Sequence, residues 1–253
     1  MATSLEEKVD KLASTVTDLT SRIRDLEDTS AIRKLHHAYG YYIDKCIYTA
    51  VVDLFSNSPN AAVHFLNGIW RGKAGVARLY VDWFDVLFTG GTNSPRRGFL
   101  LDHLMMQDII TIYRDGEGTP RTAKARFRCV LQGGSHHSVP KEERPKDVQE
   151  QFWEGGLYEN EYVFEDGVWK ILKLGYNMLW QADYEKGWSN SEAMKGVDKC
   201  FPENPLGPDE IVSEGKEVWP ETRVLPFHYL HPVTGEEVRG GLGASAIKTN
   251  LGH

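Results

Sequence analysis

Cysteine is scarce in this sequence, and its three cysteines (Cys46, Cys129 and Cys200) are an odd number without the spacing of a metal or redox motif. Their scarcity argues against a disulfide framework and predicts a reducing, cytoplasmic compartment. No apolar run approaches the roughly 18 residues that a membrane span needs. The N-terminal segment is charged from its sixth residue, unlike a secretory signal. We therefore expect no membrane association.

Positive charge is also in short supply. Lysine and arginine number 29 against 36 aspartate and glutamate, and the net charge of −7 argues against a nucleic-acid partner. Phosphate-binding GxxxxGK[ST] and GxGxxG loops are missing. His136 and His137, taken with His103, have no carboxylate or cysteine at ligand spacing, so we expect neither a metal nor a cofactor. Aromatic residues, at 11%, weakly favour a pocket for flat apolar ligands.

The first 28 residues carry an uninterrupted heptad of apolar residues. β-branched residues take the a positions and leucine takes d, which favours two strands in a parallel coil. The segment RIRDLE at 22–27 instead resembles a trimer-specifying pattern, in which Arg22 and Glu27 bracket two core residues. The narrow stripe predicts self-association as a homotrimer or a dimer, rather than a helix that packs on its own domain. The a residues are Val9, Val16 and Ile23, and the d residues are Leu5, Leu12, Leu19 and Leu26.

Beyond the heptad, the pattern predicts an α+β protein. The stripe breaks near 28–30, where Asp28 or Ser30 can cap a new helix over about 31–55. Alternation and β-branched residues then predict two long antiparallel hairpins. We expect a cone in which a curved antiparallel sheet closes around helices. The expected parts are a coiled-coil helix (1–28), an α+β domain (30–187) and an extended, proline-rich arm (188–253) that packs on the domain or on a neighbouring subunit.

One stretch of the expected second helix, HAYGYYIDKC at 37–46, places a carboxylate among tyrosines. At helical spacing His37, Tyr41, Asp44 and Tyr48 share one stripe, beside an apolar stripe that should face a core. A charge in this position indicates one wall of a cavity between the helix and the sheet.

Four stretches within about residues 30–180 resemble the nuclear transport factor two-like superfamily, in particular its SnoaL-like branch of polyketide cyclases and scytalone dehydratases. They are AIRKLHHAYGYYIDKCIYTAVVDLF, GIWRGKAGVARLY, DHLMMQDIITIYRDGEGTPRTAKARFRCVL and GLYENEYVFEDGVWKILKL. The resemblance implies the cone-shaped fold and a pocket dyad, for which Asp44 and His103 stand at the matching positions. Length, aromatic content and the C-terminal arm also look like the diarylpropane lyases, which remove formaldehyde from lignin-derived diaryl diols without a cofactor.

An imidazole beside a buried carboxylate is a general acid–base unit. Such a unit suits elimination, dehydration, cyclisation or retro-aldol cleavage, and the resemblance to the diarylpropane lyases implies a cofactor-independent lyase that converts a lignin-derived diaryl-1,3-diol to a stilbene through a quinone methide, with loss of water and formaldehyde. The alternatives are a dehydratase or polyketide-type cyclase that uses the same dyad, and a non-catalytic small subunit of a ring-hydroxylating dioxygenase.

Each candidate residue also has a structural interpretation. A lone strand histidine is more often packed than catalytic, and helix-borne Arg78 is more often solvated. Glu154 and Tyr158, just before the second hairpin, are interpreted as solvated loop residues. The expected catalytic residues are Asp44, His103 and Tyr41, and the expected substrate contacts are Tyr48, Arg78, Trp83, Tyr176 and Trp180, with Trp153 as further lining.

Overall fold

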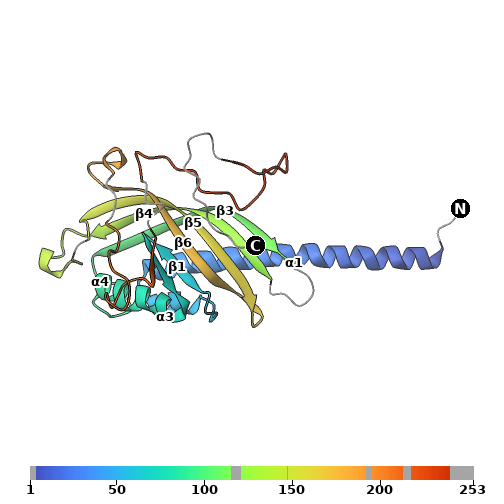
Figure 1. Cartoon of the computed structure of the whole chain (residues 1–253), viewed down its shortest axis with the longest axis horizontal. Coiled ribbons are helices and arrows are strands. Elements are labelled where there is room, and N and C mark those ends of the chain that lie inside the picture. Colours follow the sequence, from blue (N-terminus) through green and yellow to red (C-terminus); the bar gives the residue numbers. More distant parts are fainter. Residues whose placement is uncertain (1–3, 115–120, 147, 192–194, 213–217, 240–253) are drawn as a thin grey trace.

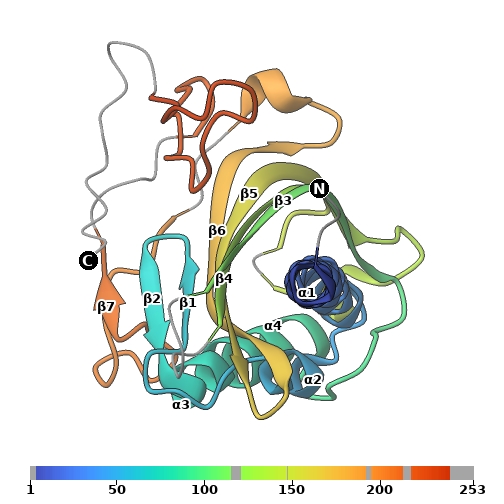
Figure 2. The ribbon, with the colours of Figure 1, turned by 90° about the vertical axis from the view of Figure 1, so that its right-hand side faces the viewer.

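A long helix, α1 (Leu5–Asp44), enters a strongly curved sheet, and short helices close the sheet's open side (Figures 1 and 2). The computed structural model describes residues 4–114, 121–146, 148–191, 195–212 and 218–239. The short helical elements are α2 (Tyr48–Asp53), α3 (Gly72–Ala77), the π-helix η1 (Arg78–Asp85), α4 (Val86–Thr89), η2 (Lys141–Glu143) and η3 (Trp188–Asn190). No helix of the described ranges is long and apolar enough to cross a membrane.

The sheet has the order β3-β4-β5-β6-β1-β2-β7 in the described part of the chain. Its pairs are antiparallel apart from β1 and β6, which run parallel. The two expected hairpins are present as β3–β4 and β5–β6, so the predicted α+β fold with a curved sheet around a helix is confirmed. The strands are β1 (Ala62–Phe65), β2 (Gly68–Arg71), β3 (Phe99–Tyr113), β4 (Thr122–Ser135), β5 (Gln151–Glu165), β6 (Val168–Asp183) and β7 (Glu210–Ile211).

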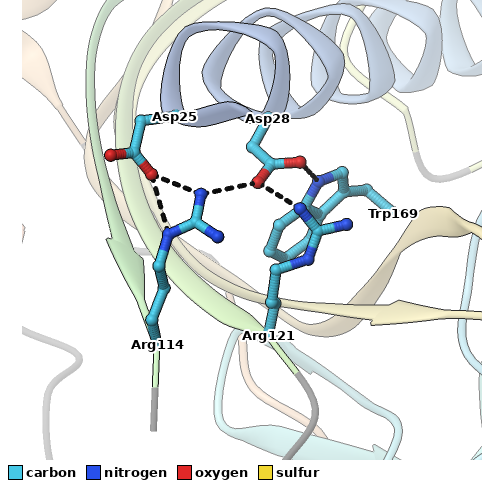
Figure 3. A network of polar contacts seen from close by, with 5 residues as sticks. All are labelled: Asp25, Asp28, Arg114, Arg121 and Trp169. Carbon is cyan, nitrogen blue, oxygen red and sulfur yellow. Dashed lines mark hydrogen bonds and ion pairs between the residues drawn. The ribbon is translucent and has the colours of Figure 1, made fainter. Parts of the chain in front are cut away.

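Helix α1 is continuous, and the break predicted near 28–30 is wrong. Asp28 does not cap a new helix. Its buried carboxylate accepts hydrogen bonds from the Trp169 indole at 2.8 Å, from Arg121 at 2.6 Å and from Arg114 at 3.3 Å (Figure 3). Arg114 directly follows β3, Arg121 directly precedes β4, and Trp169 is the second residue of β6. Asp28 therefore holds the middle of α1 against the sheet.

The core lies between the second half of α1 and the concave face of the sheet. Ile32, Tyr39 and Ile43 are buried on one face of α1, together with His36. The His36 ring stacks on Phe127 with centroids 3.8 Å apart, and burial lowers the pKa of His36 to about 3. This histidine is therefore a neutral core residue at physiological pH.

The C-terminal segments pack on the chain's own domain. Asn67 exchanges hydrogen bonds with the backbone of Val197, and the Trp70 indole donates to the Leu206 carbonyl at 3.2 Å. The segment 218–239 lies on the convex side of the sheet, where Arg126 donates to the Pro226 carbonyl at 2.7 Å (Figure 2). Within the single chain, residues 197, 206 and 226 of the expected arm thus contact their own domain.

Candidate active site

Asp44 and His103 meet where the end of α1 crosses β3. Asp44 is the last residue of the helix, and His103 is the fifth residue of the strand. Asp44 Oδ1 lies 2.6 Å from His103 Nδ1 and also accepts the His103 backbone N–H at 3.0 Å. Both side chains are about one-tenth exposed, at 10% and 9%. Two bonds to one oxygen fix the imidazole against the helix end.

This geometry decides which ring nitrogen can act. Because the carboxylate accepts, Nδ1 is the donor, and Nε2 is the nitrogen left to exchange a proton with a bound molecule. Asp44 and the C-terminal end of α1 both favour a positive charge at this point. The pair is therefore equipped to alternate between imidazole and imidazolium.

His103 lines a cavity of about 810 Å³ between α1, α2, η1 and the concave face of the sheet. The wall is mostly aromatic and aliphatic, and Lys195 and Leu206 from the C-terminal segment complete it. A cavity of this size and lining is typical of a site for a drug-sized, largely apolar ligand. Its aromatic members include Tyr39, Tyr80, Trp83, Phe84, Tyr158 and Tyr176.

A second polar group faces the cavity near His103. His103, Leu131, Glu154 and Gln181 are paired in one row across β3, β4, β5 and β6. Buried Glu154 accepts from the Tyr176 hydroxyl at 2.5 Å and from the Gln181 amide at 2.8 Å. Burial raises the pKa of Glu154, while the Tyr176 hydroxyl and nearby His103 oppose that rise.

The interpretation of Glu154 as a solvated loop residue is wrong, because β5 begins at Gln151. Gly155 and Gly156 interrupt the strand alternation of β5, because neighbouring side chains leave no room for a Cβ at either position. A Cβ on Gly155 would lie 2.2 Å from Trp180 Nε1, and one on Gly156 would lie 2.6 Å from the Tyr176 hydroxyl. Period-two alternation continued back from Tyr158 through Gly156 would have found Glu154.

The tyrosines of the cavity wall are neutral phenols. The hydroxyls of Tyr39 and Tyr80 lie 3.0 Å apart, and burial raises the pKa of both well above the usual value. Burial has the same effect on the pKa of Tyr158 and Tyr176. The Tyr176 hydroxyl already donates to Glu154, so among these phenols Tyr158 is the one placed to donate a hydrogen bond to an oxygen that gains negative charge.

Three of the expected substrate contacts, Tyr48, Trp83 and Tyr176, lie in the cavity wall. Tyr41 does not, and its predicted place at the site is wrong. Its side chain is 73% exposed, because it lies two residues, or about 200° of helix, beyond inward-facing Tyr39.

Arg78 and Trp180 are also outside the cavity. Arg78 donates to the Gly207 carbonyl at 2.9 Å and to Asp209 at 2.7 Å, so it holds the C-terminal segment on the domain. Trp180 packs edge-on against Trp153, with ring centroids 5.8 Å apart. It precedes inward-facing Gln181 in β6, so alternation places it on the other face of the sheet. The expected substrate contacts of these residues are wrong.

No cluster of three or more histidine, cysteine or acidic residues able to hold a metal ion occurs in the described ranges.

Several solved structures are similar to this chain at low identity. A proposed scytalone dehydratase from Novosphingobium aromaticivorans is 17% identical, covering 63% of this chain and 89% of that chain at a TM-score of 0.45. An NTF2-like protein with a cystatin-like fold from the same organism is 19% identical, covering 64% and 89% at 0.44. The hexachlorocyclohexane dehydrochlorinase LinA-type3 from Novosphingobium barchaimii is 15% identical, covering 64% and 92% at 0.46.

A comparison with curated proteins gave no match. The model of the SnoaL-like domain family matches residues 24–175, which is more than half of the chain. This range contains the end of α1, the short helical elements from α2 to η2 and all of β3, β4 and β5, and therefore both Asp44 and His103. The chain belongs to the SnoaL-like domain family.

Proposed function

We propose that this chain is a cofactor-independent lyase that uses His103 as its general acid and base on an aromatic small molecule. The observation that carries the proposal is the pair of bonds from His103 to Asp44, which leaves Nε2 for the cavity. An oriented imidazole in a largely aromatic cavity suits elimination and retro-aldol cleavage, in which a proton must be given and another taken.

The proposed substrate is a phenolic diaryl-1,3-diol derived from lignin. Its two aryl rings match the aromatic wall, and its hydroxyl groups match the polar row that contains His103 and Glu154. The resemblance to the diarylpropane lyases in length, aromatic content and C-terminal arm supports this narrower choice.

In the first step, the phenol loses its proton to solvent and its electrons expel the benzylic hydroxyl. The His103 imidazolium gives its Nε2 proton to that hydroxyl, so water leaves and a quinone methide remains. The buried phenol of Tyr158 stays protonated and can donate a hydrogen bond to an oxygen atom of the substrate, while Tyr176 holds Glu154.

In the second step, neutral His103 takes the proton of the primary hydroxyl. The O–H electrons form the carbonyl of formaldehyde, and the bond between this carbon and its neighbour breaks. The released pair forms the stilbene double bond and returns the ring to a phenolate, which takes up a proton from solvent. His103 is an imidazolium again, ready for the next cycle, and Asp44 stabilises that charge.

The test supplies the purified chain with a diaryl-1,3-diol that carries a para hydroxyl, and measures formaldehyde and stilbene absorbance. We expect equal amounts of both products, with turnover lowered 10²- to 10⁴-fold in His103→Gln. Tyr41→Phe, on the helix that carries Asp44, is the control and should retain wild-type rates, because Tyr41 is exposed.

The products also separate the alternative functions. If water is lost but no formaldehyde forms, the proposed formaldehyde-releasing activity is wrong, and the chain is a dehydratase that uses Asp44 and His103. If the purified chain converts no diol and co-purifies only with an oxygenase α subunit, it is the non-catalytic small subunit of such an oxygenase.

A further inference from the structure

The first half of α1 projects beyond the domain as a single helix with an uncovered apolar stripe (Figure 1). The exposure of its members runs from 47% at Leu19 to 80% at Leu5. In proteins most of the stability of a helix comes from packing of its apolar face, which is here left uncovered. The stripe consists of Leu5, Val9, Leu12, Val16, Leu19, Ile23 and Leu26.

This stripe points away from the domain. At about 100° per residue, the mean direction of Ile23 and Leu26 lies roughly 150° around the helix from the mean direction of the inward-facing Ile32, Tyr39 and Ile43. The helix therefore presents one apolar face to its own core and, further toward the N-terminus, the opposite face to its surroundings. The domain cannot cover both.

Two aspartates fix this orientation at the point where the helix leaves the domain (Figure 3). Asp25 pairs with Arg114, and Asp28 pairs with Arg114 and Arg121. They occupy the c and f positions of the heptad, on the side away from the a and d stripe. Rotation of the stripe onto the domain would break all of these contacts.

We propose that the stripe is covered by further copies of this chain in a parallel coiled coil. It extends over three heptads from Leu5 to Leu26 without a polar a or d residue, and sequences of this length and pattern form coiled coils. A stripe that followed a domain surface would be wider than the a and d positions alone.

The charges beside the stripe fit the parallel register. Arg22 is a g residue and Glu27 is the following e residue, the two positions that face each other between parallel chains. Within the chain, Arg22 meets only a weak partner in the described residues, Asp18 at 3.9 Å, where both side chains are about 70% exposed (72% and 68%). Glu27 is exposed as well. Neighbouring copies would pair Arg22 with Glu27.

The proposal is tested on the full chain by light scattering and sedimentation equilibrium at micromolar concentration. We expect a mass of two or three chains for the wild type, and of one chain for Val16→Glu with Leu19→Glu. Ser14→Glu with Ser21→Glu is the matched control, because it adds the same charge at the exposed f positions and should keep the wild-type mass. A monomeric wild type, or an unchanged mass in the stripe variant, would overturn the proposal.

A charge reversal tests the parallel register. Arg22→Glu alone should raise the dissociation constant severalfold, and adding Glu27→Arg should restore it. No restoration would overturn the parallel arrangement. Far-ultraviolet circular dichroism of each variant should retain the sheet signal, since both side chains are exposed on the surface of α1.

Discussion

Replacement of Asp28 by asparagine tests whether the middle of α1 is held by charge. The Asp28 carboxylate is 8% exposed and faces Arg114 and Arg121, which are 33% and 25% exposed. Asparagine keeps the shape and one acceptor for the Trp169 indole, but removes the negative charge between two guanidinium groups. Breaking a fully buried pair costs about 3–5 kcal/mol. Because these arginines reach water, we expect the free energy of unfolding to fall by about 2–4 kcal/mol.

Asp25→Asn is the matched control, because Asp25 pairs with the same Arg114 at the surface and is 49% exposed. An exposed pair of this kind contributes about 0–1 kcal/mol. Urea unfolding, followed by circular dichroism at one fixed chain concentration, gives both values. One molar salt should abolish the Asp25 effect and leave most of the Asp28 effect. Equal losses in the two variants, or a loss below about 1 kcal/mol for Asp28→Asn, would refute the reasoning.

Three further changes probe the site and the core. Asp44→Asn should lower kcat by about 10²- to 10⁴-fold with little change in KM, because the amide can donate to Nδ1 and move the imidazole proton to Nε2; a pH–rate profile identical to the wild type would contradict this role. The pKa of His36, about 3 in the fold, lies below that of an unfolded histidine, so stability should be complete above about pH 6.5 and fall toward pH 3 by up to about 1.4 kcal/mol per pH unit. His36→Phe should flatten that part of the stability curve, and an unchanged slope would show that another group is responsible. Gly155→Ala should destabilise the fold by about 1–3 kcal/mol, because its Cβ would overlap the Trp180 indole; a thermal melt superimposable on the wild type would show that Trp180 moves aside at no cost.

The sheet and the position of the dyad could be predicted from the sequence. Strand alternation has a period of two, so it locates the hairpins without knowledge of distant contacts. The pairing of Asp44 with His103 joins residues 59 positions apart, and only the family resemblance could suggest it. The structure places them 2.6 Å apart.

The continuity of α1 through residues 28–30 and the outward position of Tyr41 could not be predicted, for one shared reason. The apolar stripe changes from one face of the helix to the opposite face between Leu26 and Ile32, and a change of face looks like the end of a helix in the sequence. Which stripe faces the core is decided by long-range partners such as Phe127, against which His36 stacks. Tyr41 lies on the exposed side of α1, away from the face that carries Ile32, Tyr39 and Ile43.

The proposed coiled coil and the proposed acid–base pair depend on different faces of α1. Asp28 fixes the helix at its exit from the domain, and Asp44 lies 16 residues later, about 24 Å along the axis. Between them Ile32, Tyr39 and Ile43 are buried, so the position of Asp44 is set by core packing within one chain. A charge placed in the exposed stripe should therefore dissociate the copies without displacing the carboxylate from His103, and failure of the coiled coil would leave the acid–base proposal untouched.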